Sequence, residues 1–418
     1  MNSGKDVSVV ARRPFVQASL LGAGVLALSA CGGEGSDSAQ PDSSQSSSAT
    51  PSPTPTKNFA GSVEVVPAAE QVEINPVDPV TVSVTGGKFT SVEVVTMDAQ
   101  EHPVPAVGEL NSEKTVWTSA DSLLFNSEYT VRWHAEDSEG TAGTGESTFS
   151  TVSAANEADV MTNIAEGAEY GVGQIIELNF SEPVVNKAEV EKAIVVTGGG
   201  DMPGKIRWYS DTMARYRPQN YWAPRSSVNV KVNILGMDLG NGMIGNSNLQ
   251  RNFTVGEKRY ALADDNTKTI KLYVNDKMVR ENPITLGNSD WPSVIGKLVV
   301  MEQAEKYFFN PSSLNLVPGE AHYYEPFWAT NVSRLTAGGV FVHQALPSAY
   351  SSIGVVNVSH GCIGMLPEDA AYFFDVFAPG DVVETVNTGY LQADPDDGYG
   401  DWNIPFEKYQ DASWKGNW

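Results

Sequence analysis

Cysteine is scarce in this sequence of 418 residues, which has only Cys31 and Cys362. Two cysteines cannot build a scaffold of several disulfides, and they cannot supply a cysteine-rich metal site. A lone, unpaired thiol in an exported protein is a liability unless it has a chemical task. Each of the two cysteines therefore needs an explanation of its own.

Basic residues are also few, because 27 Lys and Arg stand against 51 Asp and Glu, for a net charge of −24. A nucleic-acid partner is excluded on this ground, since a phosphate backbone requires a basic footprint. The simplest meaning of the acidity is solubility. With 41% hydrophobic residues the chain has enough apolar side chains for globular domains, and its length predicts two or three of them.

Long apolar runs are missing too. The run from Leu20 to Ala30 is too short to span a bilayer stably, but it suits the apolar region of a signal peptide and follows basic Arg12 and Arg13. It ends in Leu28-Ser-Ala-Cys31, which resembles the bacterial lipobox, whose cysteine becomes the lipidated first residue. We therefore predict a lipid anchor at Cys31. An ordinary signal peptide is the alternative, and the Sec or Tat export route stays open.

The remaining chain divides by composition. A Ser/Pro/Thr-rich stretch follows the signal segment, and it has too few apolar side chains to offset its ordering entropy, so we expect a flexible tether. The expected divisions are a signal peptide (1–30), a lipidated cysteine and linker (31–61), a first Ig-like domain (62–153), a second Ig-like domain (154–256), a catalytic domain (257–388) and a C-terminal aromatic extension (389–418).

Short alternating runs predict a mainly β protein. Strands are expected in the first segment at 80–84, 91–96, 129–133 and 147–151, and in the second at 175–180, 193–197, 205–208, 228–234 and 252–255. Strands of this length and spacing in segments of about 100 residues favour two tandem Ig-like β-sandwiches. Neither segment has a titratable cluster that calls for chemistry, so their simplest role is spacing.

The third segment combines strands with one helix. Strands are expected at 269–274, 297–301, 339–343 and 382–386, and a helix over 367–377, which has a proline near its start. This predicts a mostly-β domain with one helix beside Cys362. The last thirty residues are rich in aromatic side chains, which we expect to fold back onto the protein because many exposed rings would promote aggregation.

The chemistry concentrates between His343 and Cys362. Fifteen residues separate His343 from the sequence Ser359-His360-Gly361-Cys362. A thiol becomes a good nucleophile when an imidazole stabilises its thiolate, and amides around Gly361 can form an oxyanion hole. A buried structural cysteine is one alternative. A zinc site is another, but it needs further ligands that do not appear nearby, so we expect neither a metal nor a cofactor.

This pattern resembles the signature of the L,D-transpeptidases, the YkuD-type catalytic domain, in which a histidine precedes Ser/Thr-His-Gly-Cys by 14–17 residues. The lipobox, the two Ig-like segments and the C-terminal Gly400-Asp-Trp-Asn-Ile-Pro405 are similar to the actinobacterial, mycobacterial-type lipoprotein enzymes. The resemblance implies attack of a cysteine on the third residue of a peptidoglycan tetrapeptide stem, release of D-alanine and resolution of the thioester by an amine of a second stem, giving a 3→3 cross-link. It also implies a protein at the outer face of the membrane and in the cell wall.

The resemblance assigns roles to individual residues. Cys362 matches the nucleophile, and His343 the general base and acid. His360, Ser359 and Gly361 match the catalytic turn, in which His360 shapes the loop and Ser359, with the Gln344 carbonyl, orients the base. The residues that match substrate-contacting positions are Gly338, Gly339, one of the lid tyrosines Tyr323 and Tyr324, and Gly364.

Two departures from the family pattern stand out. Relatives usually carry Arg or Asn where this chain has Gly364, so we expect Gly364→Asn to restore a donor to the substrate unless the turn or a bulky neighbour prevents it. Trp291-Pro-Ser293 stands where relatives often have a Thr-Pro segment. Two other functions stay open: an L,D-carboxypeptidase, in which water resolves the thioester, and a non-catalytic peptidoglycan-binding lipoprotein.

Overall fold

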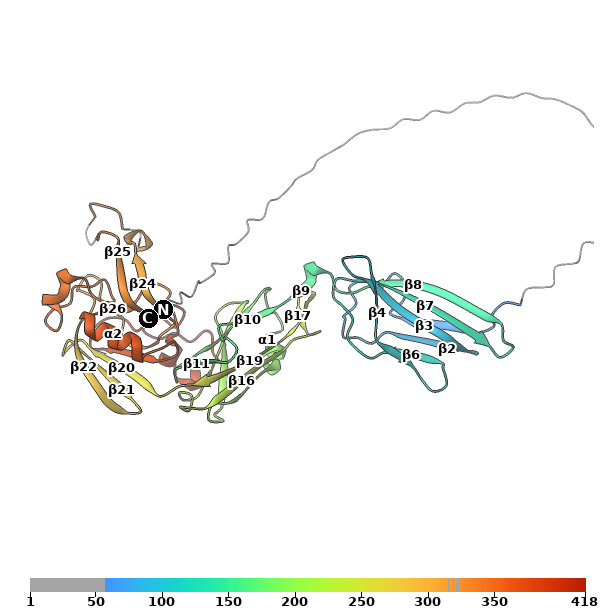
Figure 1. Ribbon diagram of the computed structural model, residues 1–418, viewed down its shortest axis with the longest axis horizontal. Coiled ribbons are helices and arrows are strands. Elements are labelled where there is room, and N and C mark those ends of the chain that lie inside the picture. Colours follow the sequence, from blue (N-terminus) through green and yellow to red (C-terminus); the bar gives the residue numbers. More distant parts are fainter. Residues whose placement is uncertain (1–56, 315, 321–322) are drawn as a thin grey trace, which may run out of the picture. The chain divides into compact units, whose positions relative to one another are not determined.

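The computed structural model describes residues 57–314, 316–320 and 323–418 (Figure 1). The expected signal peptide, Cys31 and most of the expected linker lie outside these residues. The described chain consists mainly of short strands, which confirms the predicted fold class. Within these ranges no helix has the length and apolar character needed to cross a membrane.

The first folded segment contains two four-stranded sheets. Alternating residues such as Val82, Phe89 and Val131 are buried between them, as expected for a sandwich. One sheet has the order β1 (Ser62–Val66), β2 (Thr81–Thr85), β6 (Val116–Ser119), β5 (Gly108–Leu110), and the other β4 (Pro103–Pro105), β3 (Gly87–Met97), β7 (Glu128–Asp137), β8 (Ala142–Ser150).

The second segment is built in the same way around a core that includes Leu178, Val230 and Phe253. Its sheets are β10 (Val160–Thr162), β12 (Ile176–Phe180), β15 (Met213–Pro218), β14 (Gly204–Trp208); then β11 (Ala168–Tyr170), β19 (Asn248–Val255), β16 (Ser227–Asn233), β13 (Ile194–Gly198); and the small β17 (Asp238–Gly240), β18 (Met243–Gly245), β9 (Glu157–Ala158). A short helix, α1 (Lys187–Ala193), precedes β13.

The third segment forms a nine-stranded sheet within the described residues. Its order is β23 (Gly296–Val299), β28 (Val382–Val386), β20 (Arg259–Asp264), β21 (Thr269–Val274), β22 (Lys277–Thr285), β27 (Ile363–Met365), β26 (Phe341–Gln344), β25 (Phe327–Arg334), β24 (Glu302–Phe309). Most neighbours are antiparallel, but β20 and β28 run parallel to each other, as do β26 and β27. Parallel neighbours need a crossover connection, and residues 345–362 supply it between β26 and β27.

Helix α2 (Pro367–Val376) follows β27 directly. Pro367 occupies the first turn, where its missing N–H costs no hydrogen bond, and Phe373 and Ala370 bury the apolar face in the core of this segment. The helix contacts β25, β26 and β27, so it supports the two parallel strands at the centre of the candidate site.

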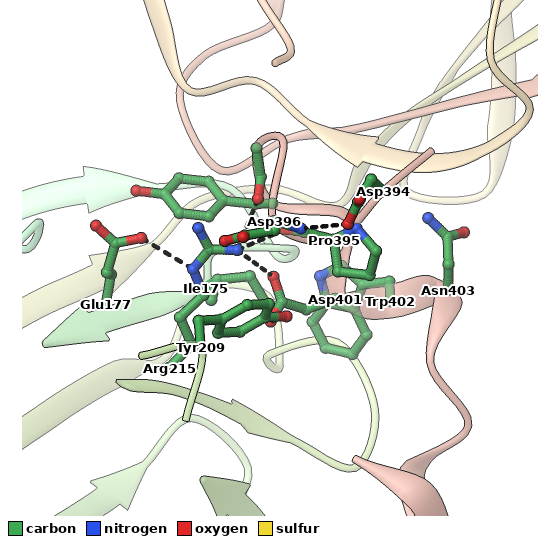
Figure 2. A network of polar contacts seen from close by, with 12 residues as sticks. Ile175, Glu177, Tyr209, Arg215, Asp394, Pro395, Asp396, Asp401, Trp402 and Asn403 are labelled. Atoms are coloured by element: carbon green, nitrogen blue, oxygen red, sulfur yellow. Dashed lines mark hydrogen bonds and ion pairs between the residues drawn. The ribbon is translucent and has the colours of Figure 1, made fainter. Parts of the chain in front are cut away.

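The C-terminal extension includes two short 3₁₀ helices, Gly400–Asn403 and Phe406–Lys408. Three buried arginines of the second segment donate to its carbonyls: Arg207 of β14 to residues 409–414, Arg215 of β15 to Pro395 and Gly398, and Arg217 to Ile404. Figure 2 shows part of this network around Arg215. The extension thus supplies acceptors to the terminal nitrogens of these guanidinium groups, which burial would otherwise leave unpaired.

Candidate active site

The sequence Ser359-His-Gly-Cys362 forms a tight turn held by two serines. Ser359 Oγ accepts the Gly361 N–H at 3.2 Å and donates to the Cys362 carbonyl at 2.7 Å. Gly361 has φ +111°, in the region that only glycine adopts at little cost. Its carbonyl accepts a hydrogen bond from Ser293 Oγ at 2.8 Å. These bonds fix the backbone on both sides of the cysteine.

The register of β26 and β27 brings the thiol and the imidazole to one face. Val342 pairs with Ile363 and His343 with Gly364. Side chains alternate between faces along a strand, so Cys362, which precedes Ile363, points to the same side as His343. Both side chains line one cleft.

His343 is held in a defined tautomer. Its Nδ1 lies 2.7 Å from the Gln344 carbonyl, and because a carbonyl only accepts, Nδ1 carries the proton and Nε2 keeps a lone pair. The ring packs against Phe309 with 5.2 Å between centroids. Burial lowers the pKa of His343, against a raising effect of the Gln344 hydrogen bond. The imidazole is therefore neutral near pH 7 and able to accept a proton.

Cys362 is a buried, neutral thiol in this structure. Only 7% of the residue is exposed, and Sγ lies 3.6 Å from the Gly339 carbonyl, to which it donates. Burial raises the pKa of the thiol to about 11, although a hydrogen bond with the Phe341 backbone lowers it. The expected thiolate–imidazolium pair is thus disfavoured at rest, because burial without a compensating charge penalises the ionised form. At rest the sulfur therefore keeps its proton.

The cleft around these two residues has a volume of about 760 Å³. His360 lines it, and the centroid of its ring lies 5.7 Å from that of Trp291 and 5.3 Å from that of Tyr324. Tyr324 also lines the cleft, and burial raises the pKa of its hydroxyl. The structure therefore brings Tyr324 to the thiol. Tyr323 is not a lining residue, so it does not join the other expected site residues there.

The glycines expected to contact substrate lie in the same cleft. Gly338 and Gly339 form its wall beside the thiol, and the Gly338 N–H donates to Asp397. The Gly361 N–H, which the sequence made a candidate oxyanion donor, is already bonded to Ser359 Oγ. This hydrogen bond disfavours the Gly361 amide as a donor to an oxyanion. Of the two amides expected to form the oxyanion hole, the Cys362 amide is the one that remains.

Gly364 fills a restricted position opposite His343. Its φ does not fall in the left-handed region, but a Cβ at this position would lie 2.8 Å from Thr285 Cγ2 and 3.4 Å from Ala345 Cβ. Thr285 is buried and cannot move without disturbing its neighbours. The neighbours that limit this position are therefore Thr285 and Ala345, and not the aromatic residues of the lid.

Sequence reasoning missed several residues of the site. Phe309, which packs on His343, belongs to a strand that the pattern did not predict. Ser293 was noted only as part of a departure from the family, and Asp397 lies in the extension, far from the motif in sequence. Among the described residues, no three His, Cys, Asp or Glu side chains gather as metal ligands would.

Comparison with known proteins defines the class to which this protein belongs. A model of the L,D-transpeptidase catalytic domain of the YkuD type matches residues 258–385, and a model of a bacterial Ig domain matches residues 71–238. The first match contains the whole constellation from Ser293 to Cys362. The chain belongs to the L,D-transpeptidase family, as the relatives described next also show.

Particular relatives come from Mycobacterium tuberculosis. The chain is 33% identical to L,D-transpeptidase 2 over 334 residues, which cover 79% of this chain and 80% of that protein, and 24% identical to L,D-transpeptidase 5 over 355 residues, which cover 83% and 76%. Among solved structures, an L,D-transpeptidase in complex with imipenem is 28% identical, with a TM-score of 0.48, over 54% of this chain and 97% of that one. The predicted family and its combination with an Ig-like domain are confirmed.

Proposed function

We propose that this L,D-transpeptidase works by cysteine catalysis, with Cys362 as the nucleophile and His343 as its base, and that it forms 3→3 cross-links in peptidoglycan. The observation that carries the proposal is the placement of the two side chains on one face of adjacent parallel strands, in one cleft. A nucleophile and a base within the same site are the minimum that acyl transfer requires.

Acylation begins from two neutral groups. As the thiol sulfur attacks the carbonyl of the third stem residue, its proton passes to His343 Nε2, and the Gln344 carbonyl stabilises the imidazolium through Nδ1. The developing oxyanion accepts a hydrogen bond from the Cys362 amide. His343 then returns the proton to the departing amine of D-alanine, which leaves a thioester on the sulfur.

Deacylation reverses these roles. The side-chain amine of a second stem attacks the thioester, and His343 takes the proton of the amine. The sulfur of Cys362 is the leaving group, and it is then reprotonated. The support for an amine rather than water as the acceptor is that the relatives of this chain are named L,D-transpeptidases.

Imipenem tests the nucleophile. Mass spectrometry of the purified protein with this compound should give one covalent adduct on the peptide that contains Cys362. The Cys362→Ala protein should give none while it keeps the parent's melting temperature. Absence of an adduct on the parent protein would refute cysteine catalysis and would favour a protein that only binds peptidoglycan.

The acceptor is tested with a tetrapeptide stem as donor. Mass spectrometry should detect a cross-linked dimer together with released D-alanine. Tripeptide without dimer, at every acceptor concentration, would instead identify an L,D-carboxypeptidase.

We also propose that Cys31 anchors the enzyme by a lipid to the outer face of the membrane, within reach of the cell wall. The support is the signal-like segment that ends at Leu28-Ser-Ala-Cys31 and the polar stretch after it. Cys31→Ala should move the protein from the membrane fraction to the soluble fraction, and Ser29→Ala, which keeps a small residue and the cysteine, should not. Membrane retention of Cys31→Ala would contradict the anchor.

A further inference from the structure

The loop that faces the nucleophile is held from outside the catalytic segment. Residues 336–340 carry the Gly339 carbonyl that accepts from Cys362 Sγ. Arg334 Nη1 donates to the Thr336 and Ala337 carbonyls. The Gly338 N–H donates to the carboxylate of Asp397, which comes from the C-terminal extension.

The contact between Asp397 and Gly338 is close and specific. A Cβ on Gly338 would lie 2.7 Å from Asp397 Oδ2 and 3.0 Å from Oδ1. The adjacent Gly398 has φ +116°, and a Cβ there would lie 2.7 Å from the Leu335 carbonyl. The extension therefore packs directly against the loop, and glycines on both sides permit the approach.

The second Ig-like segment in turn fixes the extension. Arg215 Nη1 of β15 donates to the Pro395 and Gly398 carbonyls, at 2.6 and 2.7 Å, which flank Asp397. The same guanidinium pairs with Asp401 at 3.3 Å, and Glu177 accepts from its Nε at 2.9 Å (Figure 2). Asp401 also accepts hydrogen bonds from Tyr209 and Tyr409. Such a buried network of charge-assisted hydrogen bonds holds its members in one arrangement.

We propose that Asp397 is a positioning residue for the transfer reaction: Arg215 of the Ig-like segment holds the turn around Asp397, and Asp397 holds the Gly338–Gly339 loop against Cys362. The Ig-like segment then contributes to the geometry of the active site and is not only a spacer. This inference rests on the proposed function, because the loop matters through the nucleophile it faces.

Two readouts on the Cys31→Ala protein, in which Cys362 is the sole cysteine, test the proposal. The first is the second-order rate constant for acylation by imipenem. The second is the pH profile of alkylation by iodoacetamide. Asp397→Ala should slow acylation roughly ten- to a hundredfold, the cost of a loosened catalytic geometry. It should also shift the pH profile of alkylation to lower pH. The hydrogen bond from Cys362 Sγ to the Gly339 carbonyl stabilises the neutral thiol, so its loss lowers the pKa of the thiol.

The controls separate the contact from general effects. Asp396→Ala removes the same charge from an exposed neighbour and should match the parent in both readouts. Asp397→Asn keeps an oxygen that can accept from the Gly338 N–H and should stay within about threefold of the parent. An asparagine variant as slow as the alanine variant would refute the hydrogen bond as the cause.

Further variants cover other outcomes. If Asp397→Ala does not fold, Gly338→Ala tests the contact from the other side, because its methyl group would displace the carboxylate. Arg215→Lys should slow acylation in the parent and have little added effect in Asp397→Ala, since both act through one contact.

Equal behaviour of Asp397→Ala and Asp396→Ala would overturn the proposal. Failure of the parent to react with imipenem would overturn only the proposed function, since alkylation still reports on the loop.

Discussion

At the scale of single residues, the notable property of the site is that the two groups that we propose to react, His343 and Cys362, are both neutral. Burial lowers the pKa of His343 and raises that of Cys362, so proton transfer has to accompany attack. Such a site depends on the placement of the base more than on a pre-ionised sulfur. Mutations of His343 and of its partners should therefore act on the chemical step.

His343→Ala should slow acylation by imipenem by about 10²–10⁴, the range for loss of a general base. In the parent, the rate should fall on the acidic side with an apparent pKa below the ordinary value for histidine of about 6.5, because burial favours the neutral ring. Rates measured from pH 4.5 to 8 check both points. His360→Ala serves as the comparison: a larger loss than for His343→Ala would reverse the two roles.

Gly364→Asn should lower acylation, contrary to the gain expected from the family pattern. The new Cβ would collide with Thr285 Cγ2, and overpacking of this kind costs about 1–3 kcal/mol. Thr285→Ser removes that methyl group and keeps the hydroxyl, which bonds to the Val356 carbonyl and the Val358 N–H. The double variant should recover stability in urea unfolding and part of the acylation rate. A single variant faster than the parent would contradict the steric account.

At the scale of elements, the site depends on where strands end and turn. β26 carries His343 and β27 follows Cys362. The turn between Ser359 and Cys362 is fixed by Ser293, from a loop before β23. Because Ser293 Oγ accepts the Gly287 N–H and donates to the Gly361 carbonyl, one hydroxyl joins two segments of backbone. This predicts an unusual sensitivity at a serine outside the motif.

Ser293→Ala should destabilise the protein by about 1–3 kcal/mol, because it leaves two buried backbone groups without their partner. Acylation by imipenem should slow as well, since the turn that carries Cys362 loosens. Urea unfolding and acylation rates measure the two effects, and Ser351→Ala, at an exposed position, is the matched control. Equal stability of the two variants would argue against this role.

The sequence predicted the elements with strong patterns and missed those that depend on distant partners. The strands at 81–85 and 269–274 and helix α2 lie where alternation and Pro367 indicated. β27 has three residues, one of them Gly364, so no local pattern could indicate it. The motif predicted Cys362 and His343 together. It could not predict Asp397, whose contact with Gly338 joins residues 59 positions apart, nor the neutral charge state, which burial sets.

At the scale of the whole molecule, the second Ig-like segment meets the catalytic segment at a second place. The Gly171 and Gly173 N–H groups donate to the Pro379 and Gly380 carbonyls, at 2.9 and 2.8 Å. The adjacent Asp381 is completely buried, and a Cβ on Gly171 would lie 2.3 Å from its Oδ1. Burial raises the pKa of Asp381 to about 7, although the Ala378 N–H and Arg259 lower it. This junction thus contains a carboxyl group that titrates near neutrality.

The junction should make stability depend on pH. Because the folded-state pKa of Asp381 lies above its unfolded value of about 3.9, the folded protein binds the proton more tightly. This contribution is complete below pH 4 and is lost as the pH rises through about 7, by up to about 1.4 kcal/mol per pH unit. Asp381→Asn cannot titrate, so melting temperatures of the parent should fall relative to the variant between pH 5 and 8. Parallel curves would contradict this assignment.

The protonated state of the buried thiol affects which electrophiles the thiol reacts with. Peroxides and stray disulfides react with thiolates far faster than with thiols, and they reach exposed sulfur most readily. At rest Cys362 presents no anion and only 7% of its surface, and in the proposed mechanism it ionises only when an acyl donor is bound and His343 takes its proton. The same burial that raises the pKa of the thiol should therefore slow its oxidation between turnovers.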